Sequence, residues 1–404
     1  MTEDSRPLAD VLSRAREEER IRAARALLLH PLMTMSDPEL ATVRRHAEVL
    51  RTWFARETGW VLQVERDCAR LYKRPGDLRD ETRGAPGFNR RRYVLFCLAC
   101  AALERADPQI TLKNLGERLL ELAWDPDLAA RGFSFTLESQ AERRELVHIC
   151  RSLLSLGVLQ RVAGDEEAYV QHTGDALYDV QRRVLAMLLA AARGPSTYPP
   201  EAAPADTEAR VAALAEEFVP DSTEGRRTAL RHQLARRLLD DPVTYCDELH
   251  DFSRDYFLNQ RGAMSARLCE ATGLKAEQRS EGTALVDPDG ELTDEALPAE
   301  GTLHHVTLLL AQHLAERARA GAEQGMAASE VAVFVREACD KYGRYWRKSA
   351  REPGAEAELA SDALARLVAL KLVYRQGNVV RARPALLRYA VGAAQVVQST
   401  LSLS

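Results

Sequence analysis

The 404-residue sequence predicts a mainly α-helical protein with small β-hairpins, of the α+β class, formed by a tandem duplication. Three observations predict it: an internal repeat, helices with one apolar face at matching places, and two short β-rich segments after the last helix of each copy. Each half should contain a helix, a β-hairpin and a winged-helix domain. We expect the first half at residues 1–194, with its winged helix at about 88–173, a Pro/Ala-rich linker at 195–222, and the second half at 223–404, with its winged helix at about 301–383.

The repeat has a constant offset of 214 residues. The segment ETGWVLQVERDCARLYKRPGD, which starts at Glu57, aligns without gaps with ATGLKAEQRSEGTALVDPDGE, which starts at Ala271. The identities are few, but the register continues into the later helices. Coinciding pairs include Thr58/Thr272, Gly59/Gly273, Leu71/Leu285, Gly87/Gly301 and Leu153/Leu367.

Each half begins with a helix that ends at Thr-Gly, because glycine readily takes the left-handed conformation that closes a helix. Two short alternating segments follow and predict a β-hairpin. The helices are predicted at 37–57 and 250–271. The hairpin strands are predicted at 60–65 and 69–73 in the first half, and at 274–278 and 283–286 in the second.

Three further helices follow in each half, and a hairpin closes the set. In the first half the helices are predicted at 89–105, 112–124 and 137–156. The middle helix places Leu115, Leu119 and Leu122 on one face, as Val331, Val335 and Ala338 are placed in the second half. The hairpin strands are predicted as VLQRV and YVQ around AGDEEA, and as LVYRQ and VVRA around Gly377-Asn378. Three helices and a hairpin describe a winged helix, whose third helix and wing are the usual contact surfaces.

The segment GPSTYPPEAAPADTE separates the halves. Its prolines at positions 195, 199, 200 and 204 disfavour regular structure, and we interpret it as the domain boundary.

Composition excludes several classes of protein. With 46% hydrophobic and 28% charged residues, the chain has ordinary globular composition. It has no apolar run long enough to cross a bilayer, and its charged start, MTEDSRPLAD, does not resemble a signal peptide. We therefore expect a cytoplasmic protein whose 7 scattered cysteines are reduced. A net charge of -5 restricts any DNA contact to a local patch.

No catalytic constellation is found, so we predict no catalytic residues, no cofactor and no metal, and an enzyme is the least favoured class. The sequence lacks a phosphate-binding GxxxxGK[ST], GxGxxG, HExxH and GxSxG. Cys97 and Cys100 form a lone CxxC in an apolar helix, which favours core packing. His304 and His305 are adjacent on a helix and therefore point in different directions, so they should not chelate a metal together.

Basic residues cluster in two places, where they could contact phosphate groups or simply form a solvated surface. The first cluster follows Arg79 and Arg83, and the second is interleaved with Tyr342, Tyr345 and Trp346. In contrast, the third helix of the second half begins with acids, which favours a protein partner there. The candidate DNA contacts are Arg90, Arg91 and Arg92; Lys341, Arg344, Arg347, Lys348 and Arg351; and, on the second wing, Arg375 and Arg381.

The stretch GFNRRRYVLFCLACAALERADPQITLKNLGERLLELA and the duplicated layout resemble the KITE-type subunit of Wadjet systems, which are SMC-like, condensin-related complexes that defend bacteria against plasmids. The resemblance covers roughly residues 18–392. It implies a non-catalytic tandem winged-helix subunit that binds the kleisin, the protein that bridges the heads of the SMC-like ATPase dimer. It also implies a separate nuclease subunit, and double-stranded DNA as a non-specific partner. No functional residue is carried over from the family.

The alternative function is a tandem winged-helix transcription regulator. Such a protein needs a basic recognition helix directed at base edges, whereas the helix at 359–370 has Arg366 as its only base. Neighbouring genes would distinguish the two functions, because an SMC-like ATPase and a nuclease next door favour the defence complex.

Overall fold

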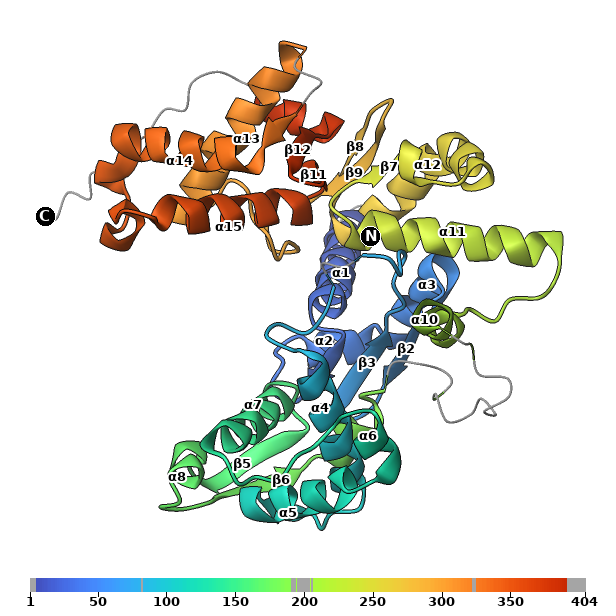
Figure 1. Ribbon diagram of the computed structural model, residues 1–404. Coiled ribbons are helices and arrows are strands. Elements are labelled where there is room, and N and C mark those ends of the chain that lie inside the picture. The colour runs from blue at the N-terminus through green and yellow to red at the C-terminus, as the bar shows by residue number, and fades with distance from the viewer. Residues whose placement is uncertain are drawn as a thin grey trace, which may run out of the picture. The chain divides into compact units, whose positions relative to one another are not determined.

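Two compact units, Met1–Gln233 and Leu234–Ser404, make up the chain in the computed structural model (Figure 1). The structure describes residues 5–80, 83–189, 194, 204, 206–321 and 325–390. In these ranges the chain is mainly helical, and each unit contains two small antiparallel sheets of three strands. The predicted α+β class is therefore confirmed. No helix in the described ranges has the length and apolar character needed to cross a membrane.

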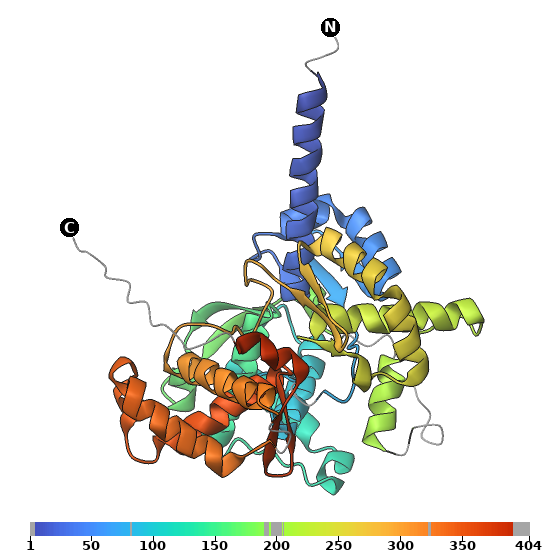
Figure 2. The same cartoon turned by 90° about the horizontal axis from the view of Figure 1, so that it is seen from above.

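The first unit begins with a long helix that packs by its C-terminal part only. Ala23, Ala24 and Leu27 of this helix are buried, whereas residues 10–18 are exposed, and the helix extends beyond the neighbouring sheet (Figure 2). The sheet has the strand order β1-β3-β2. These elements are α1 (Ser5–Leu29), β1 (Leu32–Thr34), α2 (Leu40–Arg45), α3 (Ala47–Thr58), β2 (Val61–Val64) and β3 (Cys68–Tyr72).

The single helix predicted at 37–57 is wrong, because His46 interrupts it between α2 and α3. The imidazole Nε2 of His46 lies 3.0 Å from a carboxylate oxygen of Glu19 on α1, and Arg45 donates to the same carboxylate at 2.9 Å. These contacts with a distant helix fix the backbone of His46 outside the helical region, at φ −106° and ψ 16°.

The predicted Thr-Gly helix ends are confirmed in both units. Gly59 and Gly273 have φ of 64° and 72°. The hydroxyl of Thr58 donates to the carbonyl of Phe54 at 2.7 Å, and that of Thr272 donates to Leu268 at the same distance. Each helix is therefore closed by the same local hydrogen bond, and the predicted hairpin follows it in each case.

The rest of the first unit is a helical bundle that a second three-stranded sheet closes. Leu115, Leu119, Leu146 and Leu153 of the predicted apolar faces are fully buried in its core. The sheet has the order β4-β6-β5. The elements are α4 (Arg90–Glu104), β4 (Gln109–Thr111), α5 (Leu112–Ala123), α6 (Pro126–Ala130), α7 (Gln140–Ser155), β5 (Leu159–Gly164), α8 (Glu166–Val170), β6 (Ala176–Val180) and α9 (Arg182–Ala186).

The second strand predicted for this sheet, YVQ at 169–171, is wrong. Its first two residues belong to α8, and the strand that pairs with β5 is β6. The cause is Glu166, which is buried and receives hydrogen bonds from Arg161 at 2.5 Å and from the hydroxyl of Tyr178 at 2.8 Å. Because Glu166 is held by hydrogen bonds from both β5 and β6, the chain forms the short helix α8 between these two strands.

The predicted linker 195–222 includes a helix, α10 (Thr207–Ala215), which Asp206 caps by accepting from the amide of Ala209 at 2.7 Å. Pro195, Pro199 and Pro200 lie outside the described residues. The next helix, α11 (Thr223–Asp240), contains the division between the two units.

The second unit has the same order of sheets as the first: β7-β9-β8, then β10-β12-β11. The predicted Gly-Asn hairpin is confirmed, with Gly377 at φ 60° between β11 and β12. Its elements after α11 are β7 (Thr244–Tyr245), η3 (Cys246–Glu248), α12 (Asp251–Thr272), β8 (Lys275–Gln278), β9 (Gly282–Val286), α13 (Thr302–Arg319), β10 (Met326–Ala327), α14 (Ala328–Tyr342), η4 (Gly343–Tyr345), η5 (Lys348–Arg351), α15 (Ala355–Ala369), β11 (Val373–Gln376), β12 (Val379–Ala382) and η6 (Pro384–Tyr389).

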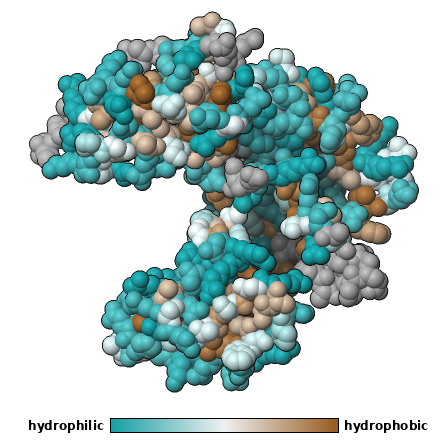
Figure 3. Space-filling model, in the orientation of Figure 1, coloured by the Kyte–Doolittle hydropathy of each residue, from teal (hydrophilic) through white to brown (hydrophobic). Residues whose placement is uncertain are grey.

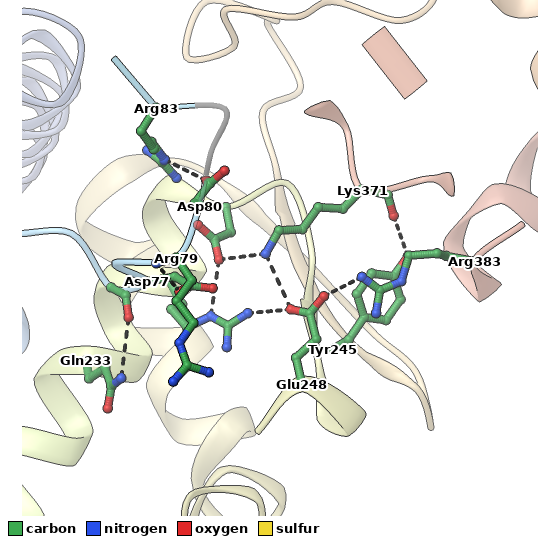
Figure 4. A network of polar contacts seen from close by, with 12 residues as sticks. Asp77, Arg79, Asp80, Arg83, Gln233, Tyr245, Glu248, Lys371 and Arg383 are labelled. Atoms are coloured by element: carbon green, nitrogen blue, oxygen red, sulfur yellow. Dashed lines mark hydrogen bonds and ion pairs between the residues drawn. The ribbon is translucent and has the colours of Figure 1, made fainter. Parts of the chain in front are cut away.

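A network of ion pairs joins the two sheets of the second unit (Figure 4). One carboxylate oxygen of Glu248 receives Arg237 at 2.5 Å and Lys371 at 3.4 Å, and the other receives Arg383. Asp241 also binds Lys371, at 3.0 Å. Because Glu248 precedes α12 while Lys371 and Arg383 flank the β11–β12 hairpin, the network fixes one part of the unit against the other.

An aromatic ring supports the same joint. The Tyr245 hydroxyl donates to the carbonyl of Lys371 at 2.9 Å, and the guanidinium carbon of Arg383 lies 3.9 Å from the centre of the Tyr245 ring. Lys371 has φ 53°, a conformation that costs free energy for a residue with a side chain. These contacts on both its carbonyl and its ammonium group stabilise that conformation.

The first unit has a different joint, in which close packing accompanies an exposed ion pair between Arg183 of α9 and Asp67 at 3.1 Å. Gly157 stands 214 positions before Lys371 and has φ 71°. A Cβ added to Gly157 would lie 2.6 Å from Cγ2 of Thr34, so the backbone packs directly on β1. Close packing at Gly157 therefore takes the place that the ion pairs of Lys371 have in the second unit.

We predict that Glu248→Gln destabilises the chain by about 2–4 kcal/mol, because it leaves three cations facing each other around a partly buried position. Burial alone would raise the pKa of Glu248, but the hydrogen bond from Arg383 and the charges of Lys371, Arg383 and Arg237 lower the pKa below its ordinary value. The contribution of this ionisation to stability is thus complete above the unfolded-state pKa and is lost as the pH falls through the lower folded-state pKa. Urea unfolding followed by circular dichroism at a series of pH values measures both effects.

The matched control is Glu277→Gln, which removes a carboxylate from an exposed ion pair with Arg388. It should cost less than about 1 kcal/mol. Equal losses in the two variants, or an unchanged acid dependence in Glu248→Gln, would contradict the role of the network.

Candidate nucleic-acid interface

The first basic cluster lies at the start of α4, where Asn89 caps the helix by accepting from the amide of Arg92 at 3.0 Å. Arg90 is exposed and makes no ion pair within the described residues. Arg91 binds Glu142 of α7 at 2.9 Å and lies over the rings of Phe133 and Phe135, at 5.6 and 5.8 Å. The aromatic rings and the carboxylate together fix the direction of Arg91.

Arg92 is also tied to α7. Its guanidinium donates to both oxygens of Glu145, at 2.8 and 2.9 Å, and to the carbonyl of Gly87. The hydrogen bond with Arg92 lowers the pKa of Glu145, and the same bond raises the pKa of Arg92. Arg91 and Arg92 therefore stabilise the packing of α4 on α7, and Arg90 is the member of the cluster that is free to meet a phosphate.

The second basic cluster begins at Lys341 in the last turn of α14 and continues along the connection to α15, and all five of its cations are exposed. Among the described residues none of the five forms an ion pair with a carboxylate. Two of them lie near aromatic rings: the Lys341 ammonium is 5.0 Å from the centre of the Tyr342 ring, and the Arg344 guanidinium is 4.6 Å from that of Tyr345. The cluster consists of Lys341, Arg344, Arg347, Lys348 and Arg351.

Buried aromatic residues hold this connection in place. Trp346 is 4% exposed, and its indole Nε1 donates to Nδ1 of His305 at 3.2 Å. The His305 ring also packs against Tyr342, with ring centres 5.4 Å apart. Burial lowers the pKa of His305, which favours the neutral ring that accepts the indole hydrogen. Trp346 and Tyr342 thus serve the core, while the neighbouring cations remain in solvent.

The two candidate DNA contacts on the β11–β12 hairpin, Arg375 and Arg381, differ in their exposure and contacts. Arg375 is exposed, whereas Arg381 donates to the side chain of Gln376 at 2.9 Å. The corresponding arginine of the first unit, Arg161, is bound to the buried Glu166. Arg375 is therefore the more available of these cations.

Acids surround the start of α15. Glu356 pairs with Arg336 of α14 at 2.7 Å and accepts from the amide of Gly354 at 2.9 Å. Arg366, the only base of this helix, pairs with Glu295 at 2.7 Å. The helix itself consequently offers exposed acids, Glu358 and Asp362, and its base is engaged.

Cofactor and metal chemistry has no evident centre in the described residues. No group of three or more His, Cys, Asp or Glu side chains in those ranges is arranged to hold a metal ion. Burial raises the pKa of the Cys97 thiol and raises that of Cys100 to about 12, so both thiols are protonated at neutral pH. His304 and His305 do not share a ligand position, because His305 is engaged with Trp346.

Sequence reasoning missed the charge network around Glu248. Its members stand far apart in the sequence and form no motif, so no local signal could have found them.

Comparison with known proteins gives one family. Neither the curated proteins nor the solved structures contain a match to the chain. The family model described as "Protein of unknown function (DUF2398)" matches residues 24–392, which is most of the sequence. The chain is therefore a member of the DUF2398 family.

Proposed function

We propose that this protein is a non-catalytic, KITE-like subunit of an SMC-like, condensin-related complex that defends cells against plasmids. In this complex it binds the kleisin subunit and contacts the DNA backbone without sequence specificity. We further propose that each unit carries a winged helix and that the two units arose by duplication.

The repeated order of elements carries the proposal. In each unit a helix and a three-stranded sheet are followed by helix, strand, helix, helix and two paired strands, with equal strand orders in the sheets; the first unit adds the short helices α6 and α8. Three helices closed by a β-hairpin are the elements of a winged helix. Two such domains in one chain are also what the resemblance to the KITE-type subunit implies.

The distribution of charge supports a backbone contact. Five exposed cations lie at the end of α14 and on the short connection after it, which a buried tryptophan holds in place. Phosphate contacts position a protein on DNA and carry no sequence information. In contrast, α15 lacks a free base that could read base edges, which weighs against the transcription regulator.

We predict that co-expression with the kleisin-like protein encoded beside this gene gives a complex that survives gel filtration. In the second unit the exposed acids of α15 and the engaged Arg366 favour contact with a protein over reading of bases. An unassociated chain in this experiment would contradict the proposal, as would hydrolysis of ATP or cleavage of plasmid by the purified chain alone.

We predict that Arg344→Gln, Arg347→Gln and Lys348→Gln together reduce the salt dependence of DNA binding by the assembled complex. Each lost phosphate contact should lower the slope of log affinity against log salt by about 0.9, or about 2.7 for all three. Fluorescence anisotropy with two unrelated duplexes over a salt series measures the slope. Arg91 and Arg92 are unsuitable for this test, because their replacement breaks the ion pairs with Glu142 and Glu145.

The control removes three exposed arginines elsewhere, with Arg14, Arg16 and Arg254 changed to Gln. It should leave the slope unchanged. The DNA contact is refuted if the two triple variants behave alike. A loss limited to one of the two duplexes would instead favour the transcription regulator.

A further inference from the structure

Arg70 lies on β3, the central strand of the first sheet, and its side chain makes no hydrogen bond or ion pair within the described residues. Its Nε is buried without an acceptor, and its guanidinium carbon lies 5.9 Å from the centre of the Tyr72 ring. Burial lowers the pKa of Arg70, as expected for a cation that loses water and gains no carboxylate. An arginine in a protein nevertheless stays charged, so this half-buried positive charge lacks a counterion.

Three other arginines with little exposure do have counterions. The side chains of Arg237, Arg366 and Arg383 are 6%, 20% and 15% exposed, and each binds a carboxylate. Such pairing offsets the free energy that a guanidinium loses when it leaves water. Arg70 has no such compensation among the described residues.

The fold of the sheet does not require Arg70. Ala284 stands 214 positions later, and it pairs with Glu277 of β8 in the same register in which Arg70 pairs with Gln63 of β2. A sheet with the equivalent strand order thus forms with a methyl group at this place. A charge that destabilises a fold without serving it is typical of a binding site.

The polar side chains beside Arg70 are engaged with one another. The Tyr72 hydroxyl donates to Oε1 of Gln63 at 3.2 Å, and Nε2 of Gln63 donates to Glu65 at 3.2 Å. These hydrogen bonds join neighbours on β2 and β3 and leave out the guanidinium. The acceptor for Arg70 therefore has to come from outside the described residues.

The surroundings of Arg70 favour a carboxylate of a protein over the phosphates of a nucleic acid. Side chains alternate along a strand, so Val61, which pairs with Tyr72, lies on the same face of the sheet as Arg70. Val61 is 59% exposed, and an apolar side chain beside a cation is typical of a protein interface. The turn at 65–67 between β2 and β3 contains two acids and one base, a balance that disfavours a polyanion.

We propose that Arg70 binds the carboxylate of an acidic side chain of the kleisin, which docks on this face of the β1-β3-β2 sheet. Arginine can bind a carboxylate through two parallel hydrogen bonds, and one of these satisfies the buried Nε. Exclusion of water around the pair strengthens the attraction. The carboxylate site follows from the contacts of Arg70 alone, whereas the kleisin as the source of the carboxylate rests on the proposed function.

The first test is the thermal unfolding of the full chain without a partner, followed by circular dichroism. Arg70→Met should raise the unfolding midpoint by about 2–4 °C, because it keeps an apolar stem and removes the unpaired charge. The matched control is Arg161→Met, which leaves the buried Glu166 without its counterion and should lower the midpoint.

The second test uses sodium propionate, which has the same carboxylate end as a glutamate side chain. Propionate should raise the midpoint of the wild type above that in sodium chloride of equal ionic strength, because a ligand of the folded state stabilises it. The rise should be absent in Arg70→Met. Sodium phosphate in the same series distinguishes the two anions, and it should raise the midpoint less than propionate does.

The third test measures the affinity of the full chain for the kleisin-like protein encoded beside this gene, by isothermal titration calorimetry. Arg70→Met should weaken this affinity at least about tenfold, because it leaves the partner's carboxylate buried without its cation. The matched control is Arg227→Met, which removes an exposed arginine of the same unit and should leave the affinity unchanged. A variant that is more stable alone but binds more weakly separates a role in binding from a role in folding.

Three results would overturn the carboxylate site. The first is a lower unfolding midpoint in Arg70→Met than in the wild type. The second is an equal effect of propionate on both chains, and the third is a larger effect of phosphate than of propionate. A kleisin-like protein that binds the wild type and Arg70→Met equally would overturn the assignment of the partner. If that protein does not bind the wild type, the proposed function is contradicted, and the propionate measurement alone decides the site.

Discussion

Glu248 is the residue on which the second unit depends, because its carboxylate binds three cations that come from different parts of the sequence. The sheets of this unit have strands of only two to five residues, and such sheets have little stability alone. The β11–β12 hairpin is therefore held against the sheet that contains β7 and β9 by side-chain contacts in addition to the pairing of strands. Tyr245 supplies a further one through the Lys371 carbonyl.

Both units solve the same problem with different chemistry. In the first, Gly157 allows the backbone to pack on Thr34, and in the second, Lys371 keeps a positive φ and sends its ammonium group to Asp241 and Glu248. Close packing is insensitive to pH and salt, whereas ion pairs respond to both.

The two units differ in charge at exposed positions, where the fold does not require a particular side chain. The core positions of the helices are apolar in both, but the connections that precede α7 and α15 carry opposite charge. Figure 3 shows hydrophilic side chains over much of the visible face of each unit, with apolar residues scattered among them. The two connections thus present opposite net charge.

Local sequence was enough to predict the helices with a strong apolar face, the Thr-Gly helix ends and the Gly377-Asn378 hairpin, because these depend on interactions between residues near in the chain. Contacts between distant residues set the remaining features. In each sheet the strand that joins the hairpin, which is β1, β4, β7 or β10, has only two or three residues, too few to show an alternating pattern. The short helix α8 depends on Glu166, which Arg161 of β5 and Tyr178 of β6 both bind. Arg91 and Arg92 are engaged by glutamates 51 and 53 positions away, whereas the cations of the second basic cluster face solvent. In the sequence both groups are simply clustered basic residues, because whether a cation is free is set by the carboxylates that folding brings to it.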